Sequence, residues 1–226
     1  MIRKPNFKLN WKYALGEVAL IFIGISLAIA FQNWNEDRKA REFEIEILSE
    51  IYTSLFLDSM ELVQNRTEYL KADQAASKLL DVDIQQQMDS VPYWLGQFLN
   101  FERFNPSSSP YEVLKSEGLQ TITSTSLRSN LAEYYDEVVP SITEAFKDVE
   151  DDFELNVVDL FKEKFKDFKF KLFAFPRDTK AFMNDESNVV YLKIFRDNRL
   201  GALDDIEKGL SIISEIRTEI KQVVNP

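Results

Sequence analysis

Residues 12–34 read KYALGEVALIFIGISLAIAFQNW, and no other stretch of the chain is apolar enough to leave water. The 22 residues from Tyr13 to Trp34 would form a helix about 33 Å long, which matches the hydrocarbon thickness of a bilayer. Tyr13 and Trp34 stand at its two ends, where amphipathic rings favour the headgroup layer, and the Lys12 side chain can reach outward beside the first. We therefore expect one membrane-spanning helix over residues 13–34, with these three residues at the interfaces.

The charges on either side of this segment predict its orientation. Four basic residues and no acidic residue precede it, at Arg3, Lys4, Lys8 and Lys12. By the positive-inside tendency, residues 1–12 form a cytoplasmic tail. The whole chain carries −11, so removing the tail's +4 and the −1 of Glu17 leaves −14 for residues 35–226. We expect residues 35–226 to form a periplasmic domain on a span held in a bacterial inner membrane.

A cleavable signal peptide is the alternative for the first thirty residues. The uninterrupted apolar run from Val18 to Phe31 is short, and Ala28-Ile29-Ala30 has the small-x-small form of a cleavage site. Against cleavage, no helix breaker or polar region separates the run from that site, and helical patterning continues beyond Trp34. We favour a retained anchor. Either reading places the large domain outside the cytoplasm.

One face of the expected span carries Glu17, Gly24 and Ala28. Gly24-x-x-x-Ala28 has the small-x-x-x-small spacing that lets two spanning helices approach closely, so it favours a homo-oligomer. Three roles remain open for Glu17: reaching the nearby headgroups, sealing a helix contact, or coupling to protons.

Beyond the span the sequence predicts an antiparallel helical bundle whose first helix continues directly from the membrane. No Gly or Pro occurs from Asn35 until Pro92, and apolar residues recur at helical spacing. We expect the first helix to end between Leu70 and Asp73, followed by helices over residues 74–88 and 92–101.

The middle of the chain contains a loop with two prolines over residues 105–110, and a helix is expected after it. Ser109 reads as its N-cap in a capping box with Glu112, and Gly118 as its C-terminal cap. The Ser/Thr tract over residues 121–126 should cap a long helix to Phe153, which Pro140 should kink without ending.

The last third of the chain contains one stretch unlike its surroundings. Residues 162–180 carry a local +4 with interleaved phenylalanines, and Phe168 to Leu172 alternates as a strand would. Two readings remain: a surface that docks a partner or the membrane, and a helix end and connector whose phenylalanines fill the core. A final helix is expected from Ser187, which Leu200-Gly201 could interrupt.

One small polar cluster is the best candidate for a ligand site. It consists of Glu112, Lys115, Ser116, Arg128, Tyr134 and Tyr135. We expect it to tie the short helix to the long one, and ligand capture is the alternative.

Composition argues against several classes of function. With no Cys and no His, the chain has no disulfide and no histidine base, and zinc could be bound only by carboxylates. No Gly-rich phosphate loop occurs, and Asp151-Asp152 and Asp204-Asp205 read as solvated surface. The acidic domain disfavours nucleic acid as a partner. We expect no catalytic, cofactor or metal site.

Two stretches resemble an uncharacterised family of bacterial single-pass membrane proteins, a domain of unknown function. The first is Tyr13-Ala14-Leu15-Gly16-Glu17-Val18 with Gln32-Asn33-Trp34-Asn35-Glu36, one residue tighter than the family's commoner Gln-x-Asn form. The second is Tyr111-Glu112-Val113-Leu114-Lys115-Ser116-Glu117-Gly118-Leu119, followed by Leu127-Arg128-Ser129-Asn130-Leu131 and Tyr134-Tyr135. Together they cover about a quarter of the chain. The resemblance implies a retained anchor and a mostly helical domain outside the cytoplasm, and it brings no assigned activity, catalytic residue or ligand.

We therefore expect a membrane-anchored interaction or scaffolding protein of the cell envelope, without catalytic activity, that forms a homo-oligomer and can bind a protein partner in the envelope. The alternative is a sensor of an extracytoplasmic ligand or stress. Because residues 1–12 are too few for an effector domain, such a sensor would have to signal through a partner protein.

Overall fold

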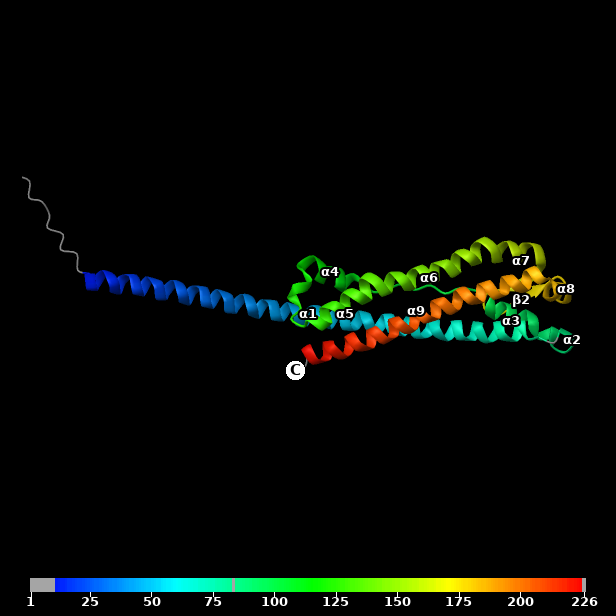
Figure 1. The fold of residues 1–226 in the computed structure, drawn as a ribbon, viewed down its shortest axis with the longest axis horizontal. Coiled ribbons are helices and arrows are strands. Elements are labelled where there is room, and N and C mark those ends of the chain that lie inside the picture. The colour runs from blue at the N-terminus through cyan, green and yellow to red at the C-terminus, as the bar shows by residue number, and fades with distance from the viewer. Residues whose placement is uncertain (1–10, 83, 225–226) are drawn as a thin grey trace, which may run out of the picture. The chain divides into compact units, whose positions relative to one another are not determined.

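The computed structural model describes residues 11–82 and 84–224 (Figure 1). The chain divides into two compact units, Met1–Glu46 and Ile47–Pro226. Helices make up most of the described residues, and the second unit also contains one two-stranded β-hairpin. The expectation of a mostly helical fold is therefore confirmed, but the all-α class did not include the hairpin.

Helix α1 (Trp11–Leu80) provides the described residues of the first unit and the first helix of the second. Among the described residues it is the one helix long and apolar enough to cross a membrane. The apolar side chains of the expected span are exposed along its length, with Leu20 and Phe22 at 72% and 73%.

The expected end of this helix between Leu70 and Asp73 is wrong, because α1 continues to Leu80. Ala72, Ala76 and Leu79 are buried at helical spacing and extend its packed face. Asp73 lies inside the helix, where its carboxylate accepts a hydrogen bond from Arg196 Nε at 2.6 Å. The carboxylate is therefore engaged with Arg196 and does not compete for the backbone N–H groups of α1.

Short elements follow α1 where one helix over residues 74–88 and a short one over residues 92–101 were expected. They are α2 (Ile84–Gln87), η1 (Met88–Ser90) and α3 (Val91–Phe98). The predicted helix over residues 74–88 is therefore wrong. The predicted helix over residues 92–101 exists but ends at Phe98, and a segment without regular secondary structure leads from it to the next helix.

Helix α4 (Ser109–Glu117) begins without the predicted capping box. Its N-cap is Ser108, whose backbone is helical (φ −92°, ψ −11°) and whose side chain makes no capping hydrogen bond. The preceding loop is held elsewhere, because the Ser107 N–H donates to Asp58 Oδ1 at 2.8 Å. The predicted cap at the other end is confirmed: Gly118 has φ 102°, which favours glycine, and its N–H donates to Leu114 O at 2.9 Å.

The long middle helix is confirmed and extends beyond its predicted end. After the turn η2 (Leu119–Thr121), it runs as α5 (Thr125–Ala132), η3 (Glu133–Val138), α6 (Val139–Asp152), η4 (Phe153–Val157) and α7 (Val158–Lys164). Ser124 caps its start by accepting from the Leu127 N–H at 3.2 Å. Pro140 does not end the helix. The wider π-helical turn η3 ends two residues before it and contains Asp136, the residue four positions earlier whose carbonyl a proline ring crowds in a regular α-helix.

The hairpin formed by β1 (Phe165–Lys169) and β2 (Phe173–Pro176) packs against α3. Lys169 pairs with Phe173 across a three-residue turn. A Cβ added to Gly96 of α3 would lie 2.3 Å from the Phe173 Cα. The strand backbone therefore approaches α3 at the one residue of that helix without a side chain.

Helices α8 (Thr179–Asn184) and α9 (Glu186–Val224) complete the fold. The suggested interruption at Leu200-Gly201 is wrong, because α9 continues through both residues. Side chains of α9 pack with those of α1, α3, η4 and the hairpin in one core, and Figure 1 shows α6 and α9 side by side. Ala174, Leu192 and Phe195 are among its fully enclosed members.

Candidate functional site

The predicted contact face of the span is open within this chain. Glu17 and Ala28 are exposed, and a Cβ added to Gly24 would meet no described atom within 4 Å. Tyr13 and Trp34 are exposed at 76% and 58%, and the Arg38 guanidinium lies 5.8 Å from the Trp34 ring. The side chain of Lys12 lies outside the described part of the chain.

The predicted polar cluster is only partly assembled. The Tyr134 and Tyr135 rings contact each other, and among the described residues Lys115 is connected to them only through Tyr111 and Asp136. Ser116 instead donates to Val113 O of its own helix at 2.8 Å, and Arg128 donates to Ile122 O at 3.1 Å beside the start of α5. Glu112 is an exposed residue of α4.

Two aspartates that the sequence analysis missed organise this cluster. Asp136 accepts from both the Tyr111 hydroxyl and Lys115 Nζ at 2.8 Å, and the Tyr111 ring stacks on Tyr135 with centroids 4.4 Å apart. Hydrogen bonding from Lys115 lowers the pKa of Asp136.

Asp58 of α1 is the second, at 1% exposure. Its Oδ2 accepts from the Tyr134 hydroxyl at 2.8 Å and its Oδ1 from the Ser107 N–H. Burial raises the pKa of Asp58, and these hydrogen bonds oppose that rise. Asp58 thus joins α1 to the 105–110 loop and to η3, and a carboxylate so enclosed has no access for a substrate. The contacts favour the tying role for this cluster over ligand capture.

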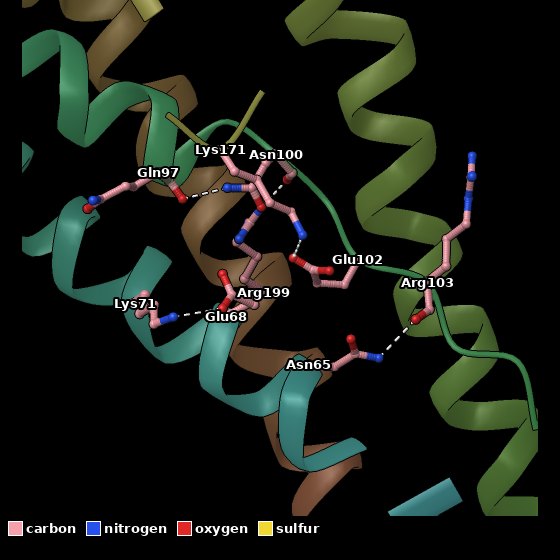
Figure 2. Close-up of polar contacts among 9 residues, drawn as sticks. All are labelled: Asn65, Glu68, Lys71, Gln97, Asn100, Glu102, Arg103, Lys171 and Arg199. Carbon is pink, nitrogen blue, oxygen red and sulfur yellow. Dashed lines mark hydrogen bonds and ion pairs between the residues drawn. The ribbon is translucent and has the colours of Figure 1, made fainter. Parts of the chain in front are cut away.

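A second polar site surrounds Arg199 of α9, which the sequence analysis also missed (Figure 2). Its side chain is 2% exposed and lies over the rings of Tyr69, Phe98 and Phe195, with the guanidinium carbon 4.9–5.7 Å from their centroids. Such cation–π contacts strengthen when water is excluded.

Arg199 has few polar partners. Its Nη2 donates to the Asn100 backbone oxygen and, at 3.2 Å, to Asn100 Oδ1, while Nε and Nη1 are buried without a hydrogen-bond partner in the described part of the chain. Burial lowers the pKa of Arg199 to about 10, and the negative field of Glu102 acts in the other direction. The structure therefore encloses a cation whose hydrogen-bonding capacity is only partly used.

The tip of the hairpin meets the same site. Lys171 Nζ lies 2.5 Å from Glu102 Oε1. Figure 2 shows the two side chains pointing toward one another. Lys171 has φ 61°, the left-handed region that a glycine or asparagine adopts more readily than a lysine. Residues with strained backbones persist where the surrounding structure holds them, and they concentrate at functional sites.

A pocket of about 370 Å³ opens beside this arrangement. It lies between α1, α3 and the hairpin turn, and it is lined by Glu68, Lys71, Gln74, Ala75, Lys78, Gln97, Asn100 and Lys171. Asn100 belongs both to this lining and to the partners of Arg199.

A metal centre has no comparable support. Within residues 11–82 and 84–224, no group of three or more carboxylates could hold a metal ion. The reading of Asp151-Asp152 and Asp204-Asp205 as solvated surface holds for Asp204, whereas Asp151 and Asp205 are half-buried, and it is wrong for Asp152. Asp152 Oδ2 is buried, and its Oδ1 accepts from Asn156 Nδ2 at 2.6 Å and from the Tyr191 hydroxyl at 3.4 Å.

No protein-family model, curated protein or solved structure matches the chain. The resemblance of residues 13–36 and 111–135 to single-pass membrane proteins of unknown function therefore remains a prediction.

Proposed function

We propose that the chain is a single-pass protein of a bacterial inner membrane, that its second unit is a periplasmic interaction domain, and that copies of the chain associate through it. The observation that carries the anchor is the apolar first part of α1, none of which is buried. A helix whose Leu20 and Phe22 are more than 70% exposed would be insoluble in water and is favoured in lipid. The basic tail and the acidic second unit support the orientation.

Support for association comes from an exposed face of α1 within the second unit. Phe56, Met60 and Val63 are 45%, 55% and 49% exposed, and Leu70 continues the same face at 42%. Exposed apolar residues that align on one helix face mark contact surfaces more often than scattered ones do.

The spacing along this face favours a second copy of the same helix as its occupant. Positions alternate by three and four residues, which is the seam of a coiled coil. They are Thr53, Phe56, Met60, Val63, Thr67 and Leu70. None of the six is charged, although 29% of the chain is charged. A face that meets its own copy must avoid like charges, and an uncharged seam does so. We call these six positions the α1 seam.

Cysteine crosslinking tests the seam directly, because the native chain contains no cysteine. The full chain with Met60→Cys, in a neutral detergent or a native membrane, should form a disulfide-linked dimer under mild oxidation. Lys193→Cys, at an exposed position of α9, is the matched control and should remain monomeric.

Two further results decide the proposal. Adding Val63→Lys to the Met60→Cys chain should remove most of the dimer, because it places like charges across the seam. Equal crosslinking from Met60→Cys and Lys193→Cys, or none from either, would contradict association through this face.

A further inference from the structure

The pocket beside Lys171 is unusual for its charge. Three of its lining side chains are lysines, at Lys71, Lys78 and Lys171, and one is a carboxylate, at Glu68. The lining therefore carries a formal +2 in a chain whose net charge is −11. Such a local excess of positive charge attracts anions against the field of the remaining protein.

The ion pairs already present leave this excess in place. Glu68 lies 2.8 Å from Lys71, and Glu102 lies 2.5 Å from Lys171. Lys78 packs over the Trp94 ring, with Nζ 5.8 Å from its centroid. When Glu102 and the enclosed Arg199 are added to the lining residues, one contributes −1 and the other +1, so the site still carries +2.

Arg199 strengthens the field from behind the pocket wall. It is almost completely buried, and two of its nitrogens have no hydrogen-bond partner in the part of the chain that the structure describes. Asn100 lies between Arg199 and the pocket, because its side-chain oxygen accepts a hydrogen bond from Arg199 and the residue also lines the pocket. A charge enclosed in protein is screened less than one in water, so an anion in the pocket would also be stabilised by Arg199.

The lysines approach from different elements. Lys71 and Lys78 are presented by α1, whereas Lys171 is held at the hairpin turn in a left-handed backbone conformation. Gln74, Gln97 and Asn100 add amide groups that can donate to oxygen atoms of a ligand. This arrangement suits a ligand with more than one negative group.

We propose that this pocket binds a small anion carrying two or more carboxylate or phosphate groups. A volume of about 370 Å³ lies at the lower end of the range for small-molecule sites, so a whole macromolecule is excluded from its interior. The proposal goes beyond association through the α1 seam and does not depend on it.

Calorimetric titration of the full chain tests the proposal. The chain is placed in phosphatidylcholine nanodiscs and titrated with citrate and, separately, with pyrophosphate, while sodium chloride keeps the ionic strength constant. At least one of the two should bind with one site per chain. Lys78→Gln should weaken that binding about tenfold, since one charge-assisted hydrogen bond is lost. Lys193→Gln, which removes an exposed lysine of α9 outside the pocket, should leave it unchanged.

Three outcomes would overturn the proposal. Binding of neither anion is the first. Equal weakening by Lys78→Gln and Lys193→Gln is the second, because it would indicate a general charge effect. The third is thermal stabilisation that requires phosphatidylglycerol in the nanodisc and is not reproduced by either free anion, because it would identify a lipid headgroup as the ligand. Circular dichroism of each variant verifies that it has folded.

Discussion

Replacing Gly96 by alanine should destabilise the second unit by displacing the hairpin from α3. The added carbon would lie 2.3 Å from Phe173 Cα and N, whereas ordinary contacts begin at 3.4 Å. Strand β2 must therefore move by roughly 1 Å, or α3 must move away from it. Both are backbone segments, so no flexible side chain can absorb the change. Overpacking of this kind costs about 1–3 kcal/mol, equivalent to a fall of about 3–10 °C in Tm for a unit of this size.

Gly201→Ala is the matched control within the same unit. Gly201 lies inside α9, and a Cβ there would meet nothing within 4 Å. Alanine should stabilise the helix by about 0.8–1.0 kcal/mol, because it has less backbone freedom to lose on folding. Thermal and urea unfolding of the full chain in neutral detergent, followed by circular dichroism, measures both changes. The reasoning is refuted if Gly96→Ala unfolds at or above the wild-type temperature, and a loss of stability in Gly201→Ala would contradict a continuous α9.

The remaining predictions concern the tyrosine–aspartate contacts and the span. Tyr134→Phe should lower the free energy of unfolding by about 1.5–3 kcal/mol in a urea titration, because it removes a hydrogen bond to a buried carboxylate. Tyr135→Phe should be nearly neutral in the same titration, because the buried Tyr135 hydroxyl has no hydrogen-bond partner in the described residues. The pKa of Asp136 is lowered in the folded state, so its stabilising effect is present above its unfolded pKa and is lost as the pH falls. The urea midpoints of wild type and Asp136→Asn should accordingly differ at pH 7 and converge toward pH 3. The pKa of Asp58 is raised in the folded state, so its effect on stability has the opposite pH dependence. Ionisation of Asp58 lowers the free energy of unfolding as the pH rises toward and through its folded-state pKa. Gly24→Ile should lower the dimer fraction measured by light scattering in neutral detergent, because a larger side chain prevents close approach of two spans.

Much of the fold could be predicted where one local rule decides the structure. Ile47, Ile51 and Leu55 recur at helical spacing on α1 and are fully buried. Gly118 and Ser124 stand where a positive φ and an N-cap require their residue types. The apolar span follows from composition alone, since it needs no partner within the chain.

Other elements depend on contacts that the sequence does not reveal. The capping box at Ser109 fails because Asp58, about fifty residues earlier, holds the preceding loop. The hairpin requires the absence of a side chain at Gly96, in a different element. The continuation of α1 depends on small buried alanines, which add little to an apolar pattern.

The candidate sites were missed for a related reason. Val190 and Ile194 share the helical spacing of the apolar residues that would mark the inner face of α9, but each is 53% exposed. The buried face carries Leu192, Phe195 and Ala202, and Arg199 lies among them. A charged residue on a buried stripe is the signal that would have identified this site, and it becomes visible only when the stripe is assigned correctly. Asp58 gives the same signal on the buried face of α1.

Labelling of a single cysteine in intact spheroplasts tests the central claim most directly. The chain with Lys208→Cys carries its one thiol at an exposed position of α9. A membrane-impermeant maleimide should label it without lysis, and the labelled protein should sediment with membranes and resist extraction by alkaline carbonate. Labelling that appears only after lysis, or labelled protein released into the soluble fraction, would contradict a retained anchor with the helical domain outside the cytoplasm.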